Sequence, residues 1–296
     1  MPYWNAYHMP VSVDEALSIL ASYGGEAQII GGGTDLLLDL QHNKEEVPRE
    51  ALVDVTRIAE MNTLAEDDGW LTLGAAVTHT TITQSALLEA RATCMVESCG
   101  VVGGPQVRNV GTIGGNVAHA LPAGDGTIGL LALGGEIEIA TADGTRWIPM
   151  QESFRAPGKS FIDRHREVLT RLRFKPTTAR EGSAHHRVMR PQGLCLPIIS
   201  MAVRLQLEAD DTISNARISM GPVGPVPFLA EAAMAVLVGD IASTEQFNKT
   251  AEAALASVTL RSSKYRASQE YREQMVRTYL PAILKRAAER ARGGGS

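Results

Sequence analysis

Two glycine-rich segments constrain the fold of this chain more than any other feature. The first, Gly31-Gly32-Gly33, follows the apolar residues 27–30 and precedes Thr34 and a second apolar run, an order that predicts strand, turn and capped helix. Glycines at such a junction let the backbone approach a ligand closely, and the following helix offers unpaired N–H groups to an anion. A purely structural turn is the alternative, because the segment has neither the lysine of a Walker loop nor the spacing GxGxxG.

The second glycine segment strengthens the anion-site interpretation. Gly114 and Gly115 again free the backbone, while Thr112 and Asn116 add side-chain hydrogen bonding without a lysine. Two such loops suit a diphosphate, because opposed sets of backbone N–H groups can hold one without a cationic side chain. Asp125, nine residues after Asn116, offers a carboxylate to ribose hydroxyls or an adenine amine. Its alternative role is that of a turn or capping aspartate.

The remaining pattern predicts an α+β protein with a C-terminal lobe of antiparallel strands backed by helices. Ser12 before an amphipathic run predicts a capped helix that ends at Gly24-Gly25. We expect further strands at residues 51–55, 70–75, 136–141, 168–174, 198–207 and 213–220, and helices at 80–90, 94–100, 127–133, 230–238, 245–257 and 269–292. Residues 177–182 are the best domain boundary, and residues 293–296 resemble a linker or tag remnant.

Composition excludes several classes of protein. With 296 residues, 44% of them hydrophobic, the chain can bury a substantial core. Its net charge of -5 comes from residues of both signs scattered along the chain, which leaves no broad basic face for a nucleic acid. No apolar run approaches the roughly 20 residues that span a bilayer, and the N-terminus has no export-signal pattern. We therefore expect no nucleic-acid partner, no membrane insertion and a cytoplasmic location.

The cysteines and histidines do not predict a metal site. Cys94, Cys99 and Cys195 have no CxxC spacing, and an iron–sulfur cluster takes about four thiolates, so inert buried thiols are expected. His185 and His186 on a strand would point to opposite faces, with no carboxylate at ligand spacing. The sequence contains no arrangement typical of Ser-His-Asp hydrolases, kinases or HExxH metalloproteases. We assign no residue a catalytic role.

Together the two segments resemble the FAD-binding domain of the xanthine dehydrogenase and carbon monoxide dehydrogenase medium-subunit family, in the molybdenum hydroxylases. The resemblance rests on Ile29-Ile30-Gly31-Gly32-Gly33-Thr34-Asp35-Leu36, Val110-Gly111-Thr112-Ile113-Gly114-Gly115-Asn116 and Asp125. Near the C-terminus, Ser263-Lys264-Tyr265-Arg266-Ala267-Ser268 and Glu270-Tyr271-Arg272 are similar to the helical end of that family's flavoprotein domain. The resemblance covers nearly the whole chain.

The resemblance implies a fold and a set of cofactor contacts. Residues 1–176 would form a two-subdomain, PCMH-type FAD-binding domain, divided at about residue 56, and residues 183–292 a CO dehydrogenase flavoprotein-type domain. FAD would be the cofactor. Its diphosphate would lie at the two glycine segments, its adenosine half at Asp125, and its flavin near Leu169 and near His186 or Arg187. The implied contacts are Ile29, Ile30, Gly31, Gly32, Gly33, Thr34, Asp35, Leu36, Thr112, Ile113, Gly114, Gly115, Asn116, Asp125, Leu169 and His186.

The same resemblance implies an oxidoreductase subunit that relays electrons. A large partner with a molybdenum cofactor would oxidise the organic substrate, and a small partner with two [2Fe–2S] clusters would carry single electrons. FAD in this chain would pass the electrons to NAD or another acceptor. The substrate, the acceptor, a dimer of heterotrimers as the assembly, and the roles of His119, His185 and His186 are left open.

Two alternative functions are also left open. The first is a self-sufficient FAD oxidoreductase of the same fold. The spacing from Asn116 to Asp125 and the short C-terminal lobe, which leaves little room for a substrate cap, favour the relay subunit over it. The second is a non-enzymatic scaffold subunit whose glycine segments are only turns. A flavin spectrum from the purified chain would exclude the scaffold.

Overall fold

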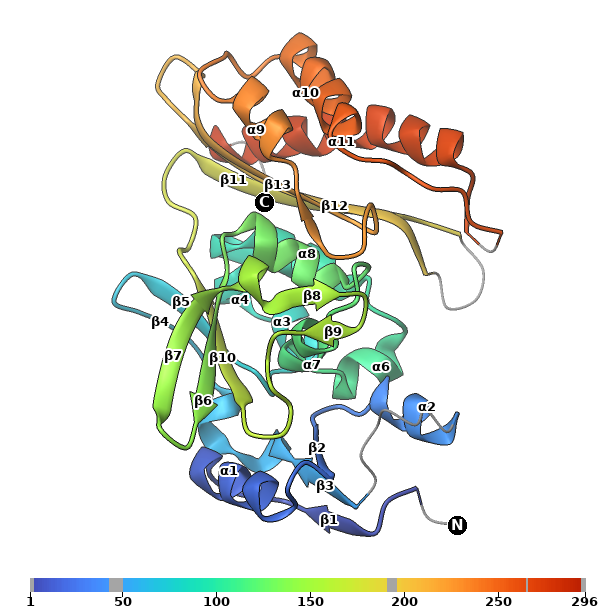
Figure 1. The fold of residues 1–296 in the computed structure, drawn as a ribbon. Helices are drawn as coiled ribbons and strands as arrows, with labels where there is room; N and C mark the ends of the chain where they lie inside the picture. Colours follow the sequence, from blue (N-terminus) through green and yellow to red (C-terminus); the bar gives the residue numbers. More distant parts are fainter. Residues whose placement is uncertain (1–2, 43–49, 191–195, 265, 294–296) are drawn as a thin grey trace.

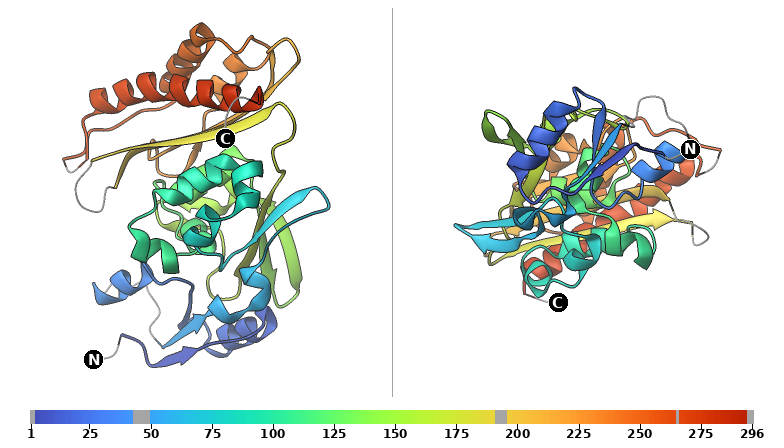
Figure 2. Two further views of the ribbon diagram at one scale, coloured as in Figure 1. Left: turned by 180° about the vertical axis from the view of Figure 1, so that it is seen from behind. Right: turned by 90° about the horizontal axis from the view of Figure 1, so that it is seen from below.

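The computed structural model describes residues 3–42, 50–190, 196–264 and 266–293 (Figure 1). Three units follow one another along the chain: a small N-terminal unit, a middle unit and a C-terminal lobe (Figures 1 and 2). Helices and strands are mixed throughout, and the last unit combines antiparallel strands with helices. The predicted α+β class is confirmed.

The N-terminal unit is built on a three-stranded parallel sheet. Its strands β1 (Ala6–His8), β2 (Ala27–Ile30) and β3 (Ala51–Asp54) lie in the order β1-β3-β2. Helix α1 (Val13–Ser22) begins where Ser12 accepts a hydrogen bond from the Glu15 N–H, as predicted, and packs on one face of the sheet. On the other face Ile30 and Leu52 pack with Leu40 of helix α2 (Leu36–Gln41), Leu36 and Trp4. The first glycine segment leaves the carboxyl end of β2, the edge at which ligands bind in open parallel sheets.

The middle unit surrounds a five-stranded antiparallel sheet. The strand order is β4-β5-β10-β6-β7, with β4 (Leu64–Asp67), β5 (Trp70–Gly74), β6 (Glu136–Thr141), β7 (Gly144–Pro149) and β10 (Val168–Phe174). One face is part of the main core, and on the outer face the Arg173 guanidinium lies 4.1 Å from the Trp70 ring centre and 4.0 Å from that of Trp147. The unit also contains three short 3-10 helices, η1 (Val55–Arg57), η2 (Ala59–Asn62) and η3 (Met150–Ser153). A small hairpin is formed by β8 (Phe154–Ala156) and β9 (Lys159–Ser160).

The middle unit also contains six short helices. They are α3 (His79–Thr83), α4 (Ala86–Arg91), α5 (Thr93–Gly100), α6 (Pro105–Val110), α7 (Ile113–Ala118) and α8 (Asp125–Ala132). The prediction of one helix over residues 80–90 is wrong. Ser85 interrupts it, because its hydroxyl accepts a hydrogen bond from the Leu88 N–H and so begins a new helix.

The C-terminal lobe is a four-stranded antiparallel sheet between two layers of helices. Strands β11 (Glu181–Met189), β12 (Pro197–Leu207), β13 (Ile213–Gly221) and β14 (Phe228–Leu229) follow in chain order across the sheet. Helices α9 (Glu231–Leu237), α10 (Thr244–Ala256) and α11 (Gln269–Ala291) cover one side, and α5 and α8 of the middle unit contact the other (Figure 1). Strand β11 begins at Glu181, inside the stretch 177–182 predicted as a boundary. Cys195, Tyr265 and residues 294–296 lie outside the described residues.

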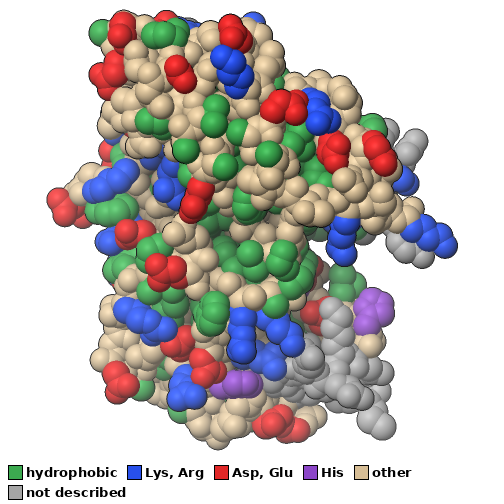
Figure 3. Space-filling view, turned by 45° about the horizontal axis from the view of Figure 1, so that its top comes forward, with side chains coloured by type: hydrophobic (Ala, Val, Ile, Leu, Met, Phe, Trp, Pro, Cys, Tyr) green, Lys and Arg blue, Asp and Glu red, His purple; other side chains and the backbone are tan. Residues whose placement is uncertain are grey.

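Two properties of the described residues bear on the expectations from composition. Within the described ranges no helix is both long enough and apolar enough to cross a membrane. On the face in Figure 3, lysine and arginine side chains form separate small groups with acidic side chains among them. The cytoplasmic location and the absence of a nucleic-acid partner stay predictions.

Candidate cofactor site

The two glycine segments lie against each other at the junction of the N-terminal and middle units, where α2 approaches α6 and α7 (Figure 1). A Cβ atom built on Gly32 would stand 2.0 Å from the Val110 carbonyl oxygen, and one on Gly31 would stand 2.9 Å from Thr112 Oγ1. Gly32 is therefore required first by the contact between the segments. The sequence located both segments, and the structure brings them together.

The first segment presents unused hydrogen-bond donors. In the part of the chain that the structure describes, the backbone N–H groups of Gly32, Gly33 and Thr34 have no acceptor. Gly33 has a φ of 68°, which favours glycine, and it lies just before α2. The prediction that Thr34 caps this helix is wrong, because Asp35 occupies the N-cap position and makes no side-chain capping bond. Three neighbouring free donors suit an anionic group with several oxygens.

The second segment is the start of a helix, contrary to the expected loop. Thr112 is the N-cap of α7, and its hydroxyl accepts a hydrogen bond from the Gly115 N–H over 3.1 Å. The Ile113 N–H donates to the Val77 carbonyl over 3.0 Å. The expectation of a second set of free N–H groups is therefore wrong for residues 113–116, because the N–H groups of all four have acceptors within the protein.

The two glycines of this helix have different roles. A Cβ on Gly114 would stand 2.6 Å from the Ala75 carbonyl oxygen, so Gly114 is needed for packing. Gly115 is exposed, and a Cβ there would meet only Thr112 Oγ1, at 3.1 Å. The second segment thus offers an open, side-chain-free surface beside the free donors of the first. This arrangement fits a diphosphate held by backbone groups.

The side chain of Asn116 is hydrogen-bonded to the neighbouring helix α8. Its Oδ1 accepts hydrogen bonds from the N–H and the hydroxyl of Thr127, both at 3.0 Å. Only the amide nitrogen of Asn116 is left to meet a ligand. No local sequence pattern predicts this contact, because Thr127 lies eleven residues after Asn116.

Asp125 is buried in an ion pair, whereas the sequence predicted an accessible ligand contact. It is 4% exposed, and its Oδ2 accepts a hydrogen bond from Arg187 Nη1 of β11 over 2.8 Å. Burial raises the pKa of Asp125 to about 6, although the Arg187 guanidinium acts against the shift. Its Oδ1 has no hydrogen-bond partner at normal distance within the described residues, while the nearby Ser200 hydroxyl favours its charged form. The carboxylate is partly satisfied by the lobe, and one oxygen is left over.

The histidines on β11 do not reach the glycine segments. His186 stacks on Tyr279 of α11, with ring centres 4.3 Å apart, on the side of the sheet away from Asp125. Of the two residues that the resemblance offered, Arg187 therefore has its side chain on the side of Asp125, and His186 does not. This geometry argues against a side-chain contact between His186 and a cofactor at the glycine segments.

His185 takes part in a buried polar cluster. Its Nε2 lies 2.7 Å from Ser200 Oγ and 3.8 Å from Asp125 Oδ1. These are the residue types of a hydrolase triad, but the same ring nitrogen faces both partners and all three are buried, so the cluster cannot act as one. Burial lowers the pKa of His185 to about 3, which keeps the ring neutral. No group of three metal-ligating side chains occurs within the described ranges.

His119 and Leu169 border the same region. His119, the C-cap of α7, has its Nδ1 3.6 Å from Asp35 Oδ2, so it links the far ends of the two segments. Leu169 lies in the core on β10 next to a register shift, and the following residue, Thr170, accepts a hydrogen bond from the Ala75 N–H. The backbone beside Leu169 is thereby tied to the strand end that supports α7.

His79 is a buried residue that sequence reasoning missed. It is 2% exposed, its N–H donates to the Gly111 carbonyl over 3.0 Å, and its ring lies against Gly111 and Gly126. Burial and, to a smaller extent, the charge of Arg108 lower the pKa of His79 to about 4. The ring is neutral at neutral pH and supports the entry to α7. Its place next to a strand end and a helix start carries no sequence signal.

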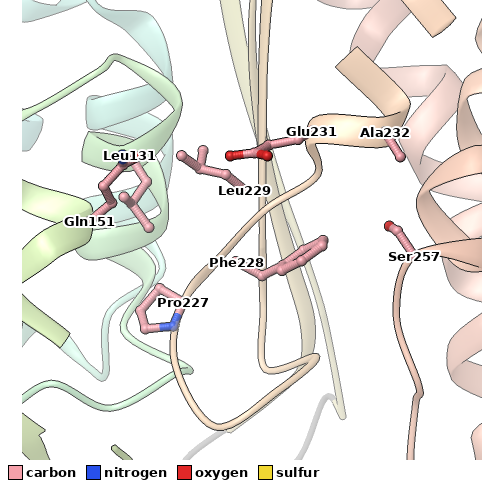
Figure 4. A pocket seen from close by; sticks show the side chains of 8 residues that line it. All are labelled: Leu131, Gln151, Pro227, Phe228, Leu229, Glu231, Ala232 and Ser257. Atoms are coloured by element: carbon pink, nitrogen blue, oxygen red, sulfur yellow. The ribbon is translucent and has the colours of Figure 1, made fainter. Parts of the chain in front are cut away.

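An open pocket of about 470 Å³ lies elsewhere, between the middle unit and the C-terminal lobe (Figure 4). Its apolar wall includes Leu131, Phe228 and Leu229, and Glu231 points toward it. None of the predicted site residues lines it.

Two family models together match nearly the whole chain. Residues 3–176 match the family described as the FAD binding domain in molybdopterin dehydrogenase, and residues 184–287 match the CO dehydrogenase flavoprotein C-terminal domain. The xanthine dehydrogenase FAD-binding subunit of Escherichia coli O157:H7 is 28% identical over 97% of this chain and 97% of its own. The carbon monoxide dehydrogenase medium chain of Hydrogenophaga pseudoflava is 27% identical over 95% and 98%.

Solved structures show the same fold. Carbon monoxide dehydrogenase from Hydrogenophaga pseudoflava, in a form that lacks the Mo-pyranopterin moiety, superposes with a TM-score of 0.90 at 27% identity over 98% of this chain and 99% of the other. Quinoline 2-oxidoreductase from Pseudomonas putida 86 gives a TM-score of 0.87 at 25% identity, with the same coverage of 98% and 99%.

The fold and the two segments define a flavoprotein subunit of an oxidoreductase complex. The chain belongs to the family of FAD-binding medium subunits of xanthine dehydrogenase and carbon monoxide dehydrogenase, and its cofactor is FAD.

Proposed function

We propose that this chain holds FAD across the two glycine segments and relays electrons within a molybdenum hydroxylase. The observation that carries the proposal is the set of free N–H groups at Gly32, Gly33 and Thr34 beside the open face of Gly115. Backbone donors and bare glycine surface can hold a diphosphate without a lysine or arginine. The proposed contacts extend over residues 29–36 and 112–116.

The flavin half would lie toward the backbone beside Leu169. We keep Asp125 in the site because its Oδ1 is buried without a hydrogen-bond partner within the described residues, which a ribose hydroxyl or adenine amine would supply. His186 faces away from Asp125, and Arg187 is held in an ion pair with Asp125, so we propose no direct side-chain contact of either residue with the flavin. The FAD-binding and C-terminal domains would cover residues 1–176 and 183–292, with the first divided near residue 56.

Bound FAD supplies the ability to take electrons singly and release them in pairs. The protein's own residues bind the diphosphate, hold the ring and exclude water. Under the proposal, a molybdenum-cofactor large subunit oxidises the substrate, and a [2Fe–2S] small subunit delivers the electrons to this chain. NAD or another acceptor then receives the electrons. A dimer of heterotrimers is compatible with this scheme.

The isolated chain tests the proposal. Loaded with FAD, it should be reduced by dithionite and reoxidised by artificial acceptors, yet it should not oxidise purines, N-heterocycles or aldehydes. Adding the iron–sulfur and molybdenum subunits should restore substrate oxidation, with reduction in the order molybdenum, cluster, flavin. Reduction of the isolated chain by an organic substrate at a catalytic rate in stopped flow would instead support the self-sufficient enzyme. Absence of flavin from a well-folded preparation would support the scaffold.

A further inference from the structure

Two sets of hydrogen bonds, linked through the first turn of α8, join the second glycine segment to the C-terminal lobe. In its first step Asn116 accepts two hydrogen bonds from Thr127, in the first turn of α8. Asp125, the first residue of that turn, accepts a hydrogen bond from Arg187 of β11 over 2.8 Å. Arg187 also donates to the carbonyl of Val101, which ends α5, over 2.6 Å.

Burial makes this series stiff. Thr127 is 1% exposed, Asp125 is 4% exposed and Arg187 is 8% exposed. The Nε of Arg187 has no hydrogen-bond partner in the described part of the chain, so Asp125 is the main compensation for its charge. Separating β11 from α8 would leave the charges of Arg187 and Asp125 buried without their partners. The ion pair therefore holds the two elements against each other.

We propose that Thr127 and Arg187 are positioning residues through which FAD binding and docking of the C-terminal lobe strengthen each other. The proposal rests on the proposed FAD site. Asn116 closes the segment whose open glycine face would meet the diphosphate, α8 carries its position to Asp125, and Arg187 ties Asp125 to the lobe. Coupling of this kind is reciprocal: whatever the docked lobe adds to FAD affinity, FAD adds to docking.

A second polar joint between the same two units provides a matched control. Glu97 of α5 accepts hydrogen bonds from Arg290 over 2.7 Å, from Arg286 over 3.1 Å and from the His185 N–H over 2.6 Å. This joint holds the lobe to the middle unit, but its hydrogen bonds involve no residue of either glycine segment. The two joints can therefore be perturbed separately.

The test uses the full chain with and without FAD, as wild type and as Thr127→Val, Arg187→Met and Glu97→Gln. FAD affinity is measured by fluorescence titration, and lobe docking by hydrogen exchange of the β11 amides. In the wild type we expect FAD to slow exchange in β11. Thr127→Val should weaken FAD binding by roughly two- to tenfold, the effect of one hydrogen bond, and FAD should then protect β11 less. Arg187→Met should abolish that protection.

Glu97→Gln distinguishes coupling from general loosening. It should speed β11 exchange with and without FAD, while the protection added by FAD persists. Equal FAD-dependent protection of β11 in the wild type and in Thr127→Val would overturn the proposal. Thr127→Val keeps the backbone hydrogen bond to Asn116, so it decides the question if Arg187→Met does not fold. Failure of the proposed function gives a different result, because the wild type itself would then bind no FAD.

Discussion

Gly115→Ala should weaken FAD binding and Gly32→Ala should lower stability, because Gly115 faces the proposed cofactor surface and Gly32 lies in the contact between the two segments. At Gly32 the new Cβ would stand 2.0 Å from a backbone oxygen of Val110, so the two segments would have to move apart. Overpacking of this kind costs about 1–3 kcal/mol, which lowers the melting temperature of a domain of 150–250 residues by roughly 2–12 °C. Gly32→Ala should therefore destabilise the protein even without FAD.

Gly115→Ala should leave the fold intact and lose the cofactor. The residue is helical and exposed, and alanine is favoured over glycine in a helix by about 0.5–1 kcal/mol. The added methyl group would occupy the surface that we assign to the diphosphate. If the methyl group holds the diphosphate away from one free donor of the first segment, the lost hydrogen bond to a charged group would cost about 1.5–3 kcal/mol, or roughly 10- to 150-fold in affinity. Gly115→Val should remove FAD more completely.

Both variants are compared with the wild type by thermal unfolding of the apoprotein and by FAD titration. The expected pattern is a normal melting temperature with weak FAD binding for Gly115→Ala, and a lowered melting temperature for Gly32→Ala. Wild-type FAD affinity in Gly115→Ala would show that the open face of α7 is not the cofactor surface. Wild-type stability in Gly32→Ala would refute the close contact between the segments.

Three further predictions concern buried groups. Asp125→Ala should lower the free energy of unfolding by about 3–5 kcal/mol, because it leaves Arg187 buried and unpaired, and should weaken FAD binding by roughly 10- to 150-fold; an unchanged dissociation constant would remove Asp125 from the site. His79 has a folded pKa of about 4 against about 6.5 when unfolded, so between these values the unfolded state binds more protons. The wild type should lose up to about 3 kcal/mol relative to His79→Gln as pH falls from 6.5 to 4, and parallel unfolding curves against pH would contradict this. Cys94 and Cys99 are buried, and burial raises both pKa values, that of Cys94 to about 12, so mass spectrometry should find neither labelled by thiol reagents at pH 8 until the protein unfolds.

Local patterns predicted much of the secondary structure. The strand at residues 168–174 was predicted with its observed bounds, because alternation of buried and outward residues is strong there. The helical start of the second glycine segment was missed, because glycine is a poor helix former and Gly114 is present for its contact with Ala75. A single capping residue, Ser85, was enough to divide a helix that periodicity extends.

The site was harder to predict, because it depends on contacts between distant parts of the chain. Arg187 and Asp125 are separated by 62 residues, and no local pattern relates them. Alternation along a strand predicts that His186 and Arg187 face opposite sides of the sheet. It does not predict which side of the sheet packs against the middle unit. Only the packing of β11 between α11 and α5 settles that question.

The position of Trp4 makes it an internal optical probe of the cofactor region. It packs against the cluster of Ile30, Leu40 and Leu52, and Ile30 directly precedes the first glycine segment. The chain has three tryptophans, and the other two, Trp70 and Trp147, enclose an arginine on the outer face of the five-stranded sheet. In a chain that carries phenylalanine at both of those positions, tryptophan emission would arise from Trp4 alone, beside the first glycine segment. Energy transfer to an arriving flavin would then be visible as a fall in that emission, in real time and without a label.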